Sequence, residues 1–352
     1  MDAVLEQFKA RIAAATAAEA PLCLRGGGTR SWYGQAEGGD PLDTSAYSGV
    51  VAYEPSELYI SARCGTLVSE IERVLDQRGQ MLAFEPPRFG PGSTVGGMLA
   101  CGMGGPRRAS AGAMRDFVLG ASLLDGRGQE LHFGGRVMKN VAGYDVSRML
   151  AGSLGTLGII LDATFKVVPK PLCEVSLEFS VDQQEALAIC LGLARNAVPV
   201  SASCWFDGKL TLRVSGAEPA VRLALSTLGG AAVVDADAFW RSLRDQRHAF
   251  FDQAAPLWRL SLPPATPVLD LEGVQLVEWG GAQRWVHAAD DGAHMRECAA
   301  RAGGHATLFR GGDKRVGVFQ PLPPALSRIH GRLKQVFDPH AIFNPGRMYK
   351  ET

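Results

Sequence analysis

The sequence predicts an α+β fold with two domains and a C-terminal segment. Pro169-Lys170-Pro171 separates a glycine-rich first region from a second region in which strand-like and helix-like runs alternate. A second group of prolines, between 321 and 324, precedes a last amphipathic run. At 352 residues the chain exceeds the usual size of one domain, and each region is long enough to bury its own core. We therefore expect domains at 1–171 and 172–320, followed by a segment at 321–352.

The first region divides at Pro86-Pro87 into lobes at about 1–88 and 89–171. Apolar residues at helical spacing between 67 and 75 predict a helix that ends at Gly79. The run Asp125-Gly126-Arg127-Gly128 predicts a hairpin. The other elements that we predict here are strands at 22–24, 49–53, 58–64, 81–84, 117–124, 129–133 and 158–168, and a helix at 141–150.

In the second region the pattern changes to longer alternating runs. It predicts strands at 174–179, 203–206, 209–214 and 274–278 and helices at 183–194 and 219–228. Such a succession favours one antiparallel sheet with helices on one face. A final helix is predicted at 325–337.

Charge and cysteine usage exclude several classes of function. Lysine plus arginine equals aspartate plus glutamate at 36 each, which leaves no electrostatic footprint for nucleic acid. The seven cysteines include no C-x-x-C pair, so no zinc site, iron–sulfur cluster or other metal site is expected from them. The N-terminus lacks the order of a signal peptide, and no apolar run approaches the ~20 residues of a membrane span. We expect a cytoplasmic protein that reaches the inner membrane only through partners.

Two glycine-rich loops are the candidate ligand-binding elements. Residues 25–29 follow a predicted strand, and residues 91–97 lead into a run of small residues. Consecutive backbone N–H groups without obstructing side chains form a concave set of donors that suits phosphate oxygens. The G-x-G-x-x-G loop of a nicotinamide-binding βαβ unit is absent from this context, so we reject that alternative.

Five motifs, in this order, carry a resemblance to a known family. They are R-G-G-G-T (25–29), P-G-S-T-V-G-G (91–97), K-N-V-A-G-Y-D (139–145), G-S-L-G-T-L-G-I-I (152–160) and D-P-H-A-I-F-N-P-G-R (338–347). Together they resemble the vanillyl-alcohol-oxidase/PCMH-type FAD-binding family, and more closely the FAD-binding E subunits of bacterial glycolate oxidases. The resemblance covers essentially the whole chain and is strongest over 22–171 and 338–347.

The resemblance implies a two-lobed PCMH-type FAD-binding domain at 1–171, an α+β cap, and a C-terminal segment that packs back on the FAD domain. The residues that it places around the pyrophosphate and ribityl chain are Arg25, Gly26, Gly27, Gly28, Thr29, Pro91, Gly92, Ser93, Thr94, Gly96 and Gly97. It assigns Gly158, Ile159 and Ile160 to the adenine end, Lys139, Asn140 and Tyr144 to the flavin ring, and Asn344 to the cofactor as well. Relatives that link flavin covalently often have histidine where Thr29 stands, so the FAD is expected to be non-covalent.

The catalytic residues are less well indicated. Related catalytic chains carry an H-x-G-D-G-N-x-H type motif in the cap, whereas residues 302–310 here contain one histidine and neither Asp nor Asn. His305 is the candidate base and Arg310 the candidate carboxylate anchor. A packed structural histidine is the alternative for His305. We predict no metal ligand.

The resemblance implies a subunit of a glycolate oxidase complex that oxidises glycolate, a small 2-hydroxy acid, to glyoxylate. Its expected partners are a second FAD-containing subunit and an iron–sulfur subunit. Two alternatives stay open: a stand-alone flavin dehydrogenase of another 2-hydroxy acid, and a non-catalytic electron-relay or structural subunit. Four cap tryptophans form either a partner-facing surface or the core of the cap: Trp240, Trp258, Trp279 and Trp285.

Overall fold

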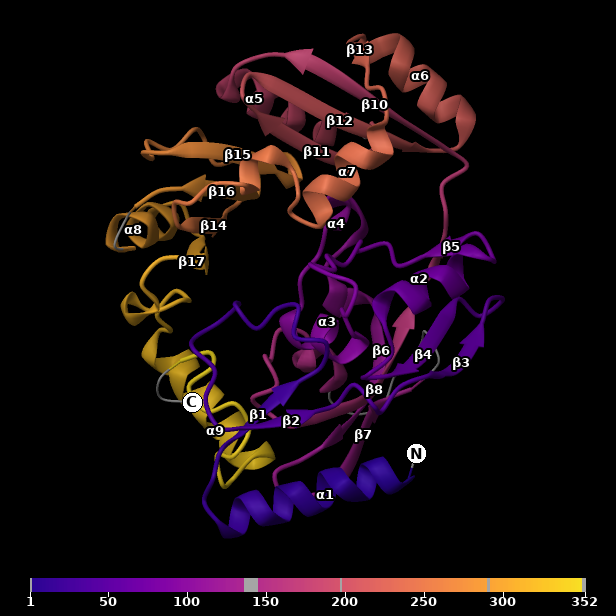
Figure 1. Ribbon diagram of the computed structural model, residues 1–352. Coiled ribbons are helices and arrows are strands. Elements are labelled where there is room, and N and C mark those ends of the chain that lie inside the picture. The colour runs from indigo at the N-terminus through magenta and orange to yellow at the C-terminus, as the bar shows by residue number, and fades with distance from the viewer. Residues whose placement is uncertain (1, 136–144, 197, 290–291, 350–352) are drawn as a thin grey trace.

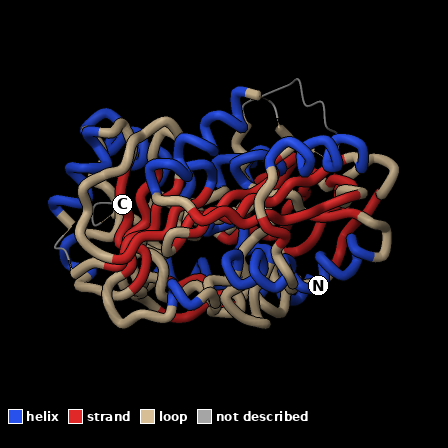
Figure 2. The backbone as a smooth tube through the Cα atoms, turned by 90° about the horizontal axis from the view of Figure 1, so that it is seen from above, coloured by secondary structure: helices blue, strands red, loops and turns tan. Residues whose placement is uncertain are grey.

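The computed structural model describes residues 2–135, 145–196, 198–289 and 292–349. These residues form a five-stranded sheet, an eight-stranded sheet and two small two-stranded sheets. In Figure 1 the eight-stranded sheet lies above the five-stranded one. Seen from above, the strands form a band with helices on both sides of it (Figure 2). The α+β class predicted from the sequence is therefore confirmed.

The five-stranded sheet is antiparallel throughout and forms the floor of the first region. Its order is β3 (Val50–Glu54), β4 (Tyr59–Arg63), β8 (Ile159–Lys166), β6 (Val118–Leu124) and β7 (Glu130–Gly134). The predicted hairpin joins β6 and β7, where Asp125 Oδ1 accepts hydrogen bonds from the backbone N–H groups of Arg127 and Gln129. One face of the five-stranded sheet is covered by two helices, α2 (Val68–Asp76) and α3 (Val95–Cys101). Helix α2 buries Val68, Ile71 and Leu75 there.

Two predicted elements of this region differ in the structure. The strand expected at 81–84 is only β5 (Gln80–Met81), because its partner β9 (Val168–Pro169) offers two residues for pairing. Leu82, Ala83 and Phe84 continue as a buried turn. Of the helix expected at 141–150, the described part contains the 3₁₀ turn η2 (Ser147–Leu150).

The C-terminal segment packs against the strand that leads into the first glycine loop. The parallel strands β1 (Leu22–Arg25) and β2 (Asp40–Asp43) pair with each other, and Leu22 also bridges to Phe343 in the C-terminal segment. Helix α1 (Asp2–Ala17) covers this junction with Phe8 and Ile12. Helix α9 (Pro324–Phe337), predicted at 325–337, runs beside it in Figure 1.

The eight-stranded sheet is antiparallel throughout, as predicted. Its order is β13 (Ala231–Ala232), β10 (Cys173–Ser180), β12 (Lys209–Gly216), β11 (Val200–Phe206), β15 (Val274–Glu278), β16 (Gln283–His287), β14 (Leu257–Ser261) and β17 (His305–Arg310). Three helices pack on its outer face: α5 (Gln183–Arg195), α6 (Glu218–Leu228) and α8 (Ala293–Arg301).

The expectation that helices cover only one face of this sheet is wrong for α7 (Ala236–Arg244). Trp240 and Leu243 of α7 pack on Ala202 and Cys204, which point to the opposite side of β11 from the residues beneath α5. This inner face also contacts Tyr33 and other residues of the first region, so the two regions share a hydrophobic cluster.

The cap tryptophans do not form an exposed patch. Trp240, Trp258 and Trp285 are 0–4% exposed, within clusters on the two faces of the sheet. Trp279 donates a hydrogen bond from Nε1 to the carbonyl of Gly105. Of the two interpretations of these residues, packing within the chain is the one that the structure supports.

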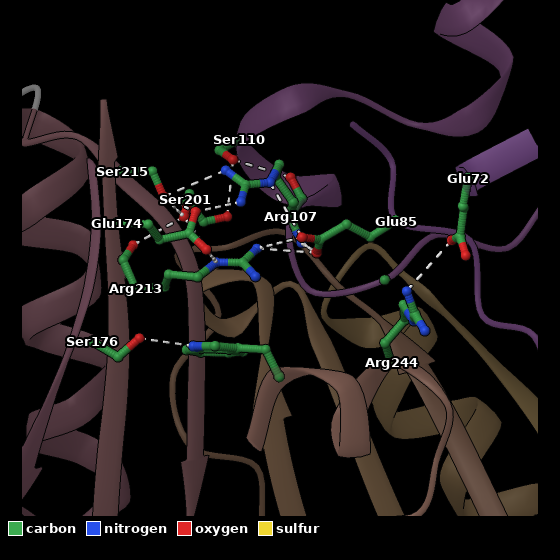
Figure 3. Close-up of polar contacts among 12 residues, drawn as sticks. Glu72, Glu85, Arg107, Ser110, Glu174, Ser176, Ser201, Arg213, Ser215 and Arg244 are labelled. Atoms are coloured by element: carbon green, nitrogen blue, oxygen red, sulfur yellow. Dashed lines mark hydrogen bonds and ion pairs between the residues drawn. The ribbon is translucent and has the colours of Figure 1, made fainter. Parts of the chain in front are cut away.

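Buried ion pairs join the cap to the first region (Figure 3). Glu85, in the turn after β5, accepts from the backbone N–H of Arg107 at 2.9 Å and pairs with Arg213 of β12 at 2.9 Å. Arg107 pairs in turn with Glu174 of β10 at 2.5 Å. Burial alone would raise the pKa of Glu174, yet Arg213 and Arg107 lower it. These four residues, here called the interface cluster, alternate in charge across the boundary.

Candidate FAD site

Both glycine loops and the C-terminal segment line one open cavity, here called the loop pocket, with about 90 Å³ open to a water-sized molecule. Strand β1 delivers residues 25–31 to its rim, and Thr94 and Gly97 approach from the start of α3. The sequence-predicted residues that line the pocket are Arg25, Gly26, Gly27, Gly28, Thr29, Thr94, Gly97 and Asn344.

The first loop offers the donors expected of a phosphate site. The backbone N–H groups of residues 26–30 form no hydrogen bond with the described part of the chain. Gly28 has φ +68°, and no atom lies within 4 Å of the place a Cβ would take. A backbone in the left-handed region favours glycine, because the residue has no Cβ to strain. This stretch of backbone can therefore receive an anion such as a pyrophosphate.

The neighbouring glycines serve close packing instead. A Cβ on Gly27 would lie 1.5 Å from the carbonyl oxygen of Gly92, so the second loop fills that space. The N–H of Gly96 donates to the carbonyl of Cys64 at 2.8 Å, and a Cβ there would meet Cys64. A contact of Gly27 and Gly96 with phosphate oxygens stays a prediction. Both glycines let the two loops and β4 approach each other.

Arg30 links the two loops, and the sequence analysis did not single it out. Its Nη1 donates to Ser93 Oγ at 2.9 Å, and its Nη2 donates to the carbonyl of Pro87. The side chain is buried beside the ring of Phe89, and burial lowers the pKa of Arg30. Its Nε is buried without a hydrogen-bond partner in the described residues. The only sequence feature that could have indicated Arg30 is its position directly after the R-G-G-G-T motif.

The C-terminal motif closes the pocket through two side chains. Asn344 Oδ1 accepts from the backbone N–H of Leu24 at 2.8 Å, and its Nδ2 donates to the carbonyl of Leu154 at 2.8 Å. Arg347 Nη2 donates to the carbonyl of Ser31 at 2.7 Å. Because both polar atoms of the Asn344 amide bond to backbone, that side chain positions the loops.

The other predicted cofactor residues lie elsewhere or outside the described residues. Pro91, Gly92 and Ser93 do not line the loop pocket, and Gly92 and Ser93 contact Gly27 and Arg30 of the first loop. Ile159 and Ile160 are buried in β8, and a Cβ on Gly158 would lie 2.5 Å from the carbonyl oxygen of Leu124. A contact of residues 158–160 with the adenine end stays a prediction. Lys139, Asn140 and Tyr144 lie outside the described residues.

The structure does not bring His305 and Arg310 together. They occupy the two ends of β17, and five strand steps separate them by about 16 Å. His305 is exposed, whereas Arg310 donates to Gln246 Oε1 at 2.6 Å and lies over the ring of Trp32 at 4.5 Å. A shared site for one small hydroxy acid is therefore unsupported.

Two further properties concern metals and membranes. Within the described residues, no group of three or more His, Cys, Asp or Glu side chains is arranged to hold a metal ion. None of the helices in the same part of the chain combines the length and the apolar character needed to cross a membrane.

Comparison with known proteins agrees with this geometry. A model of the FAD binding domain family matches residues 4–134. The solved structure of p-cresol methylhydroxylase with substrate bound superposes with a TM-score of 0.71 at 15% identity, over 99% of this chain and 88% of that one. An alkyldihydroxyacetonephosphate synthase superposes with a TM-score of 0.66 over 97% of this chain and 75% of that one. Fold and loop pocket together define a PCMH-type FAD-binding flavoprotein.

Sequence relatives narrow the class. Glycolate oxidase subunit GlcE of Escherichia coli (strain K12) is 44% identical over 349 residues, which is 99% of this chain and 97% of that protein. D-lactate dehydrogenase of Archaeoglobus fulgidus is 24% identical over 98% of this chain and 90% of that protein. Glycolate oxidase subunit GlcD of Bacillus subtilis (strain 168) is 33% identical over 43% of this chain and 32% of that protein. This chain belongs to the glycolate oxidase subunit GlcE family, and FAD is its cofactor.

Proposed function

We propose that this chain is the FAD-binding subunit of a glycolate oxidase complex that oxidises glycolate to glyoxylate. The observation that carries the proposal is the 44% identity to a glycolate oxidase subunit across 99% of the chain. The loop pocket supports it, because the free N–H groups of residues 26–30 and the open space at Gly28 fit a pyrophosphate. We propose that the FAD is held without a covalent bond, because Thr29 offers no ring nitrogen for a link to flavin.

FAD, when bound, supplies an acceptor for the two electrons of a hydride. The chain itself contributes binding and position. Residues 26–30 hold the pyrophosphate, Arg30 and Asn344 fix the loops against each other, and the inner face of the cap sheet covers the site. Preorganisation of this kind lowers the cost of bringing substrate and cofactor together.

We propose that the electrons pass on to a second FAD-containing subunit and an iron–sulfur subunit. The word subunit in the relatives' names and the lack of a C-x-x-C pair in this sequence support that arrangement. The complex would lie in the cytoplasm and contact the inner membrane through those partners.

The test is co-expression of this chain with the neighbouring flavoprotein and iron–sulfur chains. We expect a co-purifying assembly in which glycolate, added without oxygen, bleaches the flavin absorbance and reduces a dye acceptor. The isolated chain, loaded with FAD, is the control and should be far less active. An isolated chain that is fully active and indifferent to the partners would contradict the complex. Bleaching of the partner's flavin alone would favour the relay function.

A further inference from the structure

A second cavity lies on the inner face of the cap sheet, and a hydrogen bond joins a residue of its lining to a residue that lines the loop pocket. The cavity is small, with about 20 Å³ open to a water-sized molecule, and we call it the inner-face cavity. Residues 103–106 line it from the FAD domain, and Arg259, Glu278 and Trp285 line it from the cap. The Tyr33 hydroxyl, which belongs to a residue of the loop pocket, accepts a hydrogen bond from Arg259 Nη2 at 3.1 Å.

Arg259 is a half-buried cation without a carboxylate partner. No Asp or Glu of the described residues forms an ion pair with it, and its Nε is buried without a hydrogen-bond partner there. Aromatic rings of Tyr33 and Phe309 lie 5.9 and 5.2 Å from the guanidinium carbon. A guanidinium with unused donors in an apolar wall is suited to a carboxylate ligand.

Glu278 is a buried carboxyl group that forms no ion pair with a cation of the described residues. It is 4% exposed, and its Oε2 accepts hydrogen bonds from Trp285 Nε1 at 2.7 Å and Gln283 Nε2 at 3.0 Å. Its Oε1 forms no hydrogen bond with the described residues, and Glu278 lines the inner-face cavity. Burial raises the pKa of Glu278 to about 7, and Glu85 raises it as well.

The register of the sheet points Arg259 and Glu278 into the same cavity. Arg259 on β14 lies opposite Trp285 on β16, which lies opposite Leu276 on β15. Glu278 stands two residues beyond Leu276, on the same face. The side chain of Trp285 therefore lies between the Arg259 guanidinium and the Glu278 carboxyl group.

We propose that the inner-face cavity binds a small monocarboxylate, with Arg259 holding its carboxylate and the protonated Glu278 donating a hydrogen bond to the same ligand. The ligand class rests on the proposed function, in which the substrate and product are both small monocarboxylates. The site takes the place of the His305 and Arg310 pair, which the fold separates.

Other charged groups near Glu278 leave this assignment intact. Arg244 lines the cavity but pairs with Asp245 at 2.9 Å and with Glu72 at 3.5 Å. Cys204 lies opposite Glu278 on β11, and Glu85 is neutralised by Arg107 and Arg213. Among these side chains Arg259 is the cation that an added anion can pair with.

The test measures binding of acetate to the FAD-loaded chain by NMR line broadening, because acetate carries the carboxylate and has no hydroxyl to oxidise. We expect Arg259→Met to weaken binding at least tenfold, while Arg222→Met, at an exposed site of α6, leaves it unchanged. The dissociation constant should be flat between about pH 5.5 and 7, where acetate is ionised, and rise about tenfold per pH unit above 7. Glu278→Gln, which resembles the protonated acid, should bind acetate with no such rise.

Several outcomes would overturn the proposal. They are no saturable acetate binding by the unmodified chain, equal binding by Arg259→Met, and an unchanged pH dependence in Glu278→Gln. Flavin absorbance and melting temperature show that each variant is folded. Glycolate oxidation by the assembled complex is measured in parallel. If the complex oxidises glycolate but Arg259→Met binds acetate as well as the unmodified chain does, the proposed acetate site is refuted and the proposed function is not. If the chain binds neither FAD nor its partners, the proposed function is refuted.

Discussion

Replacing Glu85 with glutamine should loosen the contact between the cap and the FAD domain. In the interface cluster two arginine side chains, 9% and 5% exposed, face two glutamates. Glu85→Gln leaves one positive charge in excess. Removing one partner of a buried pair costs about 3–5 kcal/mol, but the Glu85 side chain is 18% exposed and glutamine still accepts hydrogen bonds. We therefore expect a loss of about 2 kcal/mol, equivalent to a melting temperature about 4–8 °C lower.

The assay is urea unfolding of the purified chain, followed by circular dichroism and tryptophan fluorescence. Glu218→Gln is the matched control, because Glu218 pairs with Arg222 on exposed α6, with side chains 68% and 75% exposed. An exposed pair of this kind contributes at most about 1 kcal/mol. If Glu85→Gln unfolds at the same urea concentration as Glu218→Gln, the alternating charges of the interface cluster do not hold the two sheets together.

Three further predictions follow from single positions. Gly28→Val should abolish most FAD binding, because it adds a side chain to the loop pocket at φ +68°, whereas Gly208→Val, at φ +74° with equally open surroundings, should keep its flavin; equal flavin absorbance in the two variants would contradict the pocket. Acid precipitation should release all flavin into the supernatant, because Thr29 offers no link, and flavin in the pellet would refute this. The pKa of Glu278 is raised from 4.5 to about 7 in the folded state, so the native protein keeps a proton there that the unfolded chain releases. The free energy of unfolding should therefore fall as pH rises from 4.5 to 7, by about 3 kcal/mol relative to Glu278→Gln, and stay level above; parallel pH profiles would contradict the shift.

Local patterns predicted the elements that local chemistry determines. The hairpin at 125–128, the helix at 67–75 and the antiparallel cap sheet all follow from turn residues or from apolar spacing. The sequence could not predict on which face of the cap sheet α7 packs. Strand β11 carries small residues on both faces, so the pattern of its side chains does not show which face a helix covers. Glycines gave a similar ambiguity: Gly27 and Gly28 are adjacent and identical, yet one is packed against backbone and the other faces open space.

The polar residues of the inner-face cavity could not be predicted from the sequence either. Arg259 and Glu278 are brought together by the sheet order β15–β16–β14, in which β14 precedes both of its neighbours in the sequence. Nothing in the spacing of 259 and 278 indicates that order. His305 and Arg310 were indicated by the partial likeness of residues 302–310 to the H-x-G-D-G-N-x-H type motif, but the two residues lie at opposite ends of β17.

Contacts between the two ends of the sequence also determine when the FAD domain can close during synthesis. Leu22 pairs with Phe343, and Asn344 and Arg347 form hydrogen bonds with the first loop and the strand before it. Residues 22–31 leave the ribosome early, yet the partners that fix them arrive some 320 residues later. The whole cap must emerge in between. The nascent FAD domain therefore waits with its cofactor loop unclosed, and a chain released before Arg347 should fail to retain flavin even though every glycine of the two loops is already in place.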